Sequence, residues 1–152
     1  ADGHEDRNSP TYDGDANGFP STATAQGAWD GKFITTTNSP VDWLGTNQND
    51  NLWQGVNGVN NPCPAGYRLP TETELSSLNI ADESDAFSKL KLPVAGLRSL
   101  TNGMILFVGA IGYYWSDTVS GTNIRRLSFN SNGSYINTGN RASGISLRCL
   151  KD

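Results

Sequence analysis

The sequence predicts an α+β fold in which short strands and two short helices are joined by long loops. The chain has 17 glycines, 7 prolines and only 36% hydrophobic residues, so much of it must run through turns. Helix-start signals precede residues 71–80 and 82–90. Downstream, short apolar and aromatic runs alternate with turn residues, as strands do. With 152 residues, the chain is expected to form a single domain, residues 1–152.

The first 28 residues are predicted to be irregular, because they are rich in glycine and show almost no apolar periodicity. Within them lies the opening of a calcium-binding loop, with oxygen-bearing side chains at alternate positions and Gly18 at the sixth. The candidate ligands are Asp13, Asp15 and Asn17. The twelfth position is Thr24 instead of the glutamate that completes such loops. Both a weak calcium site and an ordinary polar loop stay open.

Tryptophans and amide side chains dominate residues 29–59, where a short strand is expected at 32–35. Trp29, Trp43 and Trp53 have two interpretations. They can anchor ordered loops by burying their rings, or they can form platforms on which sugars stack. A loop-rich domain needs such anchors, which favours packing, but the sequence leaves both open.

Residues 62–75 change from a constrained, proline-rich extended segment into a helix. Thr71 can cap the helix, and Glu74 three residues later can return a hydrogen bond to the cap. The acids of the first turn also suit the positive end of the helix dipole. A helix over residues 71–80 is therefore expected.

The two cysteines connect this segment to the end of the chain. Cys63 precedes the capped helix, and Cys149 lies in residues 145–150, which alternate like a half-buried strand. We expect this terminal strand to lie beside the Cys63 segment and a disulfide to join them. Closing so long a loop stabilises a fold by roughly 4 kcal/mol. The alternative is a pair of buried free thiols.

Between the capped helix and the terminal strand, the sequence predicts a second helix and a series of strands. Residues 104–109 form the most hydrophobic run of the chain, and Asn130-Ser131-Asn132-Gly133 is a hairpin signal. The expected elements are a helix at 82–90 and strands at 92–98, 112–116, 124–129 and 134–137.

Composition excludes several classes of protein. The net charge is −4, and Arg125-Arg126 is the one adjacent basic pair, so no nucleic-acid footprint exists. No stretch approaches the ~20 apolar residues that span a bilayer, which predicts no membrane insertion. Charged residues make up 17% of the chain, below the roughly 25% of typical soluble domains. Together with the expected disulfide, this favours an extracellular location, at a cell surface or on a virion.

Several motifs resemble a known family. Residues 66–74 are similar to the "RLPTEAEW" segment of formylglycine-generating-enzyme-like domains. Residues 112–116, 123–129 and 141–149 resemble the C-terminal half of the Fibrobacter succinogenes major paralogous domain, found in bacterial surface proteins and phage tail proteins. The resemblance covers roughly residues 49–152 and implies a C-type-lectin-like fold, with a small twisted antiparallel sheet, two short helices and long ordered loops.

The resemblance also carries expectations about assembly and function. Relatives usually have further residues before a segment like 1–4, so the chain is expected to begin inside the domain. The missing first strand would then come from another chain (in a homo-oligomer or from a partner), from cleavage or from an unobserved region. Related variable proteins use the C-terminal part of this fold to display a ligand-binding surface.

We expect no catalysis. Formylglycine-generating enzymes hold copper between two thiols, but Cys63 and Cys149 occupy places that the resemblance assigns to a structural bridge. His4 is the only histidine, and the chain contains neither a G-x-S-x-G stretch nor a phosphate-binding loop. The paired acids lie at helix starts, where capping explains them.

The predicted binding surface lies between residues 120 and 140, where polar side chains alternate with apolar residues and glycine. Such Asn, Ser, Tyr and Arg side chains form an adaptable hydrogen-bonding face. The candidates are Asn123, Arg125, Asn130, Asn132, Ser134, Tyr135 and Asn137. They predict a binding module, an adhesin-like or phage receptor-binding domain, that recognises a surface glycan or protein. An ordinary solvated hairpin, or a structural subunit of a filament or fibre, is the alternative.

Overall fold

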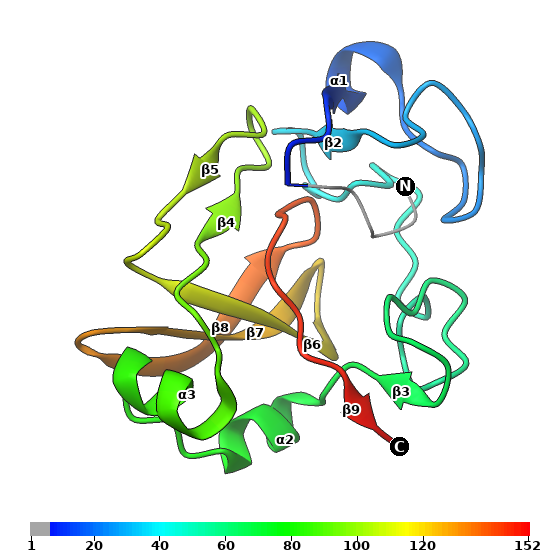
Figure 1. Ribbon diagram of the computed structural model, residues 1–152. Helices are drawn as coiled ribbons and strands as arrows, with labels where there is room; N and C mark the ends of the chain where they lie inside the picture. The colour runs from blue at the N-terminus through cyan, green and yellow to red at the C-terminus, as the bar shows by residue number, and fades with distance from the viewer. Residues whose placement is uncertain (1–6) are drawn as a thin grey trace.

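A three-stranded antiparallel sheet lies at the centre of the computed structural model, which describes residues 7–152 (Figure 1). Its strands are β6 (Gly112–Ser120), β7 (Asn123–Asn130) and β8 (Gly133–Asn140), in the order β6-β7-β8. Two-residue turns join them, and the hairpin signal at residues 130–133 predicted the one between β7 and β8. The mixture of helices and strands confirms the α+β class.

Two capped helices begin where the sequence predicted. At the start of α2 (Glu72–Ser77), the Thr71 hydroxyl accepts from the Glu74 N–H and the Glu74 carboxylate accepts from the Thr71 N–H, so both halves of the capping box form. Asp82 caps α3 (Glu83–Leu90) by accepting from the Asp85 N–H. The expected helix at 71–80 is shorter than predicted, because the chain turns through Asn79 at a φ of 46°.

Both helices pack on one face of the sheet, which we call the helix-covered face. Figure 1 shows α2 and α3 together on the same side of β6, β7 and β8. The shared core contains the following buried residues: Leu75, Ile80, Ala86, Leu92, Tyr114, Leu127 and Phe129. A Cβ at Gly112 would lie 2.3 Å from the Phe129 ring, so only glycine lets the ring sit there.

A second core joins the N-terminal half to the far end of the sheet. Its buried residues include Leu44, Leu52, Trp53, Leu69 and Ile124. Trp43 and Trp115 pack against it, and Trp29 meets the Tyr12 ring edge-on. The prediction that the tryptophans act as packing anchors agrees with these contacts.

The N-terminal stretch is more ordered than the sequence suggested. β1 (Thr11–Asp13) pairs in parallel with β2 (Phe33–Thr35), and α1 (Gly14–Asn17) follows β1. The expected strand at 32–35 is confirmed as β2. The prediction of irregular structure was wrong for residues 11–17. These residues are ordered by pairing with a segment 22 residues downstream, in which Phe33 lies opposite Thr11. Local periodicity cannot show such a pairing.

The end of the chain lies beside the Cys63 segment, as predicted. β3 (Tyr67–Arg68) pairs antiparallel with β9 (Leu150–Lys151), and Cys63 and Cys149 form a disulfide with an S–S distance of 2.05 Å. No cysteine is free, so the alternative of two thiols is wrong.

The other predicted strands shorten to a few residues each. β4 (Leu97–Arg98) pairs with β5 (Ile105–Leu106), in place of the expected strand at 92–98. Most of the expected terminal strand makes only isolated bridges, Tyr114 to Ser146 and Arg98 to Gly144. These bridges place residues 144–146 between β6 and β4.

The most hydrophobic run of the chain lies largely at the surface. Met104, Phe107 and Val108 are each more than half exposed, because the β4–β5 hairpin leaves this edge uncovered within residues 7–152. In the same part of the chain, none of the helices has the length and apolar character needed to cross a membrane.

Candidate binding surface

The strand register separates the side chains of the β7–β8 hairpin onto two faces. Successive residues of a strand point to opposite sides, and Leu127 and Phe129 point to the helices. Arg126 and Ser128 therefore point away from the helices, together with their cross-strand partners. We call this second surface the open face. It comprises Tyr113, Arg126, Ser128, Tyr135 and Asn137; Trp115 and Ile124 share this side of the sheet but pack into the second core.

Hydrogen bonds and a ring contact connect four of these residues. The guanidinium of Arg126 lies 4.5 Å from the centre of the Tyr113 ring, and its Nε donates to Asn137 Oδ1 at 3.0 Å. Asn137 Nδ2 in turn donates to Ser128 Oγ at 2.8 Å. This network holds Arg126 in one orientation. Tyr135, on the same face, is 58% exposed and leans towards Gly133.

The positive charge of Arg126 has no negatively charged partner in the described part of the chain. Burial lowers its pKa from the ordinary value, yet no carboxylate contacts it within residues 7–152. β7 and β8 contain no acidic residue. Within residues 7–152, the fully buried polar side-chain atoms without a hydrogen-bond partner are Trp53 Nε1 and Arg141 Nε, so the terminal nitrogens of Arg126 still touch solvent. Partly desolvated charges are normally paired, which makes this one a functional candidate.

The structure does not bring the seven predicted binding residues onto one surface. Tyr135 and Asn137 lie on the open face. Arg125 lies on the helix-covered face, where its Nη2 is 2.8 Å from Glu72 Oε1, and Asn123 shares its side of the strand. Ser134 is also on that face and donates to the Ile80 carbonyl.

The remaining two predicted residues shape the turn between the strands. Asn130 Oδ1 accepts a hydrogen bond from the Asn132 N–H at 2.8 Å. This is a local turn interaction, so these side chains contribute to the hairpin's geometry.

Arg126 was missed although the sequence contained the signal. Leu127 and Phe129 are apolar residues two apart in β7, so alternation places Arg125 with them and Arg126 on the opposite side, which it shares with Ile124. The contact with Tyr113 could not be read from the sequence, because it depends on the pairing of β6 with β7.

The predicted calcium ligands all have protein partners. Asp13 caps α1 by accepting from the Ala16 N–H, and Asn17 donates to the Asp13 carbonyl. Asp15 accepts from the Thr36 hydroxyl and from the Thr37 N–H. Among the described residues, no group of three or more His, Cys, Asp or Glu side chains could hold a metal. Calcium binding stays a prediction.

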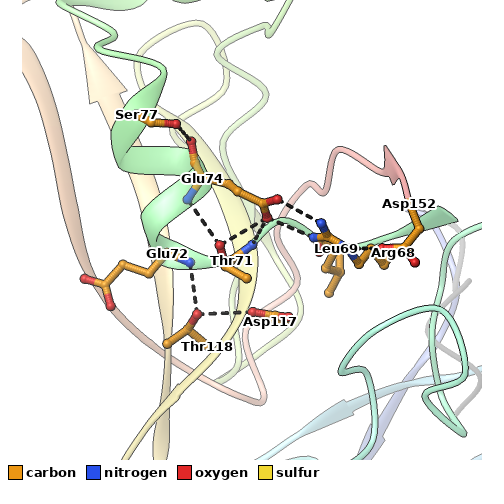
Figure 2. A network of polar contacts seen from close by, with 9 residues as sticks. All are labelled: Arg68, Leu69, Thr71, Glu72, Glu74, Ser77, Asp117, Thr118 and Asp152. Carbon is orange, nitrogen blue, oxygen red and sulfur yellow. Dashed lines mark hydrogen bonds and ion pairs between the residues drawn. The ribbon is translucent and has the colours of Figure 1, made fainter.

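The acids at the start of α2 belong to an ion-pair network (Figure 2). Arg68 contacts both Glu74 and Asp152 at 2.8 Å. Hydrogen bonds from Arg68 lower the pKa of Glu74 to about 2. Asp117, whose pKa burial raises, accepts from the Thr118 hydroxyl. These contacts give the acids at the start of α2 structural partners.

His4, the only histidine, lies outside the described residues.

A cavity of about 190 Å³ lies beside the open face. Trp43, Trp53 and Trp115 line it, together with Arg141. Arg141 is buried and neutralised, since its Nη2 is 2.5 Å from Asp50 Oδ1 and its Nε 3.7 Å from Asp42 Oδ2. The tryptophans thus have both a packing role and access to a cavity.

Comparisons of the chain with protein-family models, curated proteins and solved structures found no match. Function is therefore inferred from the side chains and their geometry.

Proposed function

We propose that the chain is a non-catalytic extracellular binding module that recognises a surface glycan or protein through its open face. The observation that supports this most strongly is the exposed Tyr135 ring on the same face as the ordered Arg126–Asn137 pair. An amphipathic ring next to pre-oriented polar groups binds at a modest entropic cost.

The architecture supports a C-type-lectin-like fold within this proposal. A small antiparallel sheet carries two short helices on one face, and long loops are tied down by the disulfide. Disulfides persist in oxidising compartments, which supports a location at a cell surface or on a virion.

A non-catalytic role is supported by what the acids do. Glu74 completes the capping box and pairs with Arg68, and Glu72 pairs with Arg125. Carboxylates engaged in this way are poor candidates for acid–base chemistry.

A glycan array tests the proposal, with variants of two exposed tyrosines. Tyr135→Ala should abolish binding, because it removes the exposed ring of the open face. Tyr67→Ala is the matched control, since Tyr67 is 38% exposed but lies on β3. Binding that survives Tyr135→Ala, or that fails equally in both variants, would count against the open face.

The alternative, a structural subunit of a filament or fibre, is favoured by the outer edge of β8. This eight-residue strand pairs only with β7 within the described chain, and it has neither the proline nor the lysine that often protect edges. Light scattering after gel filtration tests it. Concentration-dependent polymers would support assembly, and a monomer at all concentrations would oppose it.

A further inference from the structure

We propose that the ligand of the open face is an acidic glycan, and that Arg126 binds the carboxylate of one of its sugars. This inference rests on the proposed binding function and specifies the class of ligand.

Arg126 differs in its partners from three other arginines of the chain. Arg68, Arg125 and Arg141 each contact a carboxylate oxygen within 2.8 Å. Arg126 contacts none within residues 7–152, although the sheet partly buries it. A guanidinium that has lost water without gaining an anion is destabilising, and a bound carboxylate would relieve that cost.

The guanidinium of Arg126 has partners at its Nε and at the Tyr113 ring. The Nε donates to Asn137 Oδ1, and the central carbon lies 4.5 Å from the centre of the Tyr113 ring. The two terminal nitrogens remain. Such a fork matches the two oxygens of a carboxylate in a bidentate pair. Because Tyr113 and Asn137 already hold the group in place, little freedom is lost on binding.

An aromatic ring lies near the anion site. Arg126 is opposite Asn137 on β8, and Tyr135 comes two residues before Asn137 on the same face. Diagonal neighbours of this kind are about 7–8 Å apart. The Tyr135 side chain leans along the strand towards Gly133, since its hydroxyl is 3.3 Å from where a Gly133 Cβ would lie. An oligosaccharide with its uronic acid held at Arg126 would therefore reach the exposed Tyr135 ring with a neighbouring sugar.

A sugar fits this surface better than a protein side chain does. Protein interfaces depend on a buried apolar centre, but Tyr135 is the one exposed large hydrophobic residue of the open face. The chain's net charge of −4 does not oppose acidic ligands at short range, because distant charges are screened beyond about 8 Å at physiological salt.

Titration calorimetry with a galacturonic-acid oligosaccharide, and with the same oligosaccharide methyl-esterified, tests the inference. The acid should bind about 10- to 100-fold more tightly than the ester, as expected for a charge-assisted hydrogen bond. Arg126→Gln should remove that preference, and Arg126→Lys should restore only part of it. Arg125→Gln is the matched control and should leave it unchanged, because Arg125 points to the helices.

The outcomes separate the two proposals. Equal binding of acid and ester, lost in Tyr135→Ala, would overturn the acidic ligand and leave the binding function standing. Binding of a poly-glutamate peptide that is lost in Arg126→Gln, while neither oligosaccharide binds, would overturn the glycan in favour of a protein. Absence of binding to any glycan, on the array or in calorimetry, and to the peptide would overturn both. The comparison of acid with ester uses the wild-type chain, so it does not depend on a variant's folding.

Discussion

Arg125 and Arg126 are neighbours in the sequence, but their side chains lie on opposite faces of the sheet. Arg125 lies on the helix-covered face, paired with Glu72. Arg126 lies on the open face, held by an amide and a tyrosine ring, without a carboxylate among the described residues. One face of the sheet thus completes its interactions within the chain, while the other leaves donors available.

This difference separates residues that maintain the fold from residues that can bind. On the helix-covered face, Phe129 is 1% exposed, whereas Tyr135 on the open face is 58% exposed. Substitutions on the first face should therefore change stability, and those on the second should change binding.

The largest expected effect comes from the core of the helix-covered face. Phe129→Ala should lower the free energy of unfolding by about 3–5 kcal/mol, because it leaves a cavity under the helices. Tyr135→Ala should change it by less than about 0.5 kcal/mol, as exposed substitutions do. Urea unfolding measures both. Similar losses in the two variants would contradict the division between the faces.

Removing the disulfide should have the next largest effect. In Cys63→Ser/Cys149→Ser, the unfolded chain regains the freedom of an 86-residue loop, and the expected loss of stability is about 2–4 kcal/mol. The same unfolding measurement applies, with dithiothreitol-treated wild type as the matched sample. A variant as stable as the wild type would show that β9 is held by its strand pairing alone.

Acid should lower the stability of the fold by protonating Glu74 at the start of α2. Its pKa is about 2 in the folded chain against an ordinary 4.5, so its stabilising contribution is present above pH 4.5 and is lost as the pH falls towards 2. Thermal unfolding from pH 6 to pH 2 should show a falling midpoint, and Glu74→Gln should flatten that slope. An equally steep slope in the variant would assign the acid sensitivity to other groups.

Substitutions of Arg125 and Arg126 should change the stability of the protein by smaller amounts, which differ between the two residues. Arg125→Gln should lower the unfolding midpoint slightly, because it breaks the pair with Glu72. Arg126→Gln should leave the midpoint unchanged or raise it, since a partly buried and unpaired charge is removed. Calorimetry at neutral pH compares them. A greater loss in Arg126→Gln would mean that its positive charge supports the fold.

The smallest effect is expected from chelation of calcium. Asp15 already accepts hydrogen bonds at both carboxylate oxygens, from Thr36 and Thr37, so EDTA should not shift the unfolding midpoint. A drop that calcium reverses, and that Asp15→Asn abolishes, would instead establish the loop as a metal site.

Local signals predicted much of the fold. The capping box of Thr71 and Glu74 was predicted because its partners lie three residues apart. The hairpin was predicted because Asn130, Ser131, Asn132 and Gly133 are consecutive turn residues. The disulfide was predicted because the chain has only two cysteines and a composition typical of proteins from oxidising compartments.

The amino-acid sequence on its own therefore specified the helix starts, the hairpin and the covalent link, since each depends on neighbouring residues or on a unique pair. The tertiary structure alone decided that β1 would pair with β2 and that Tyr113 would lie against Arg126. Those contacts join segments distant along the chain, and their energies depend on which strands meet and in which register.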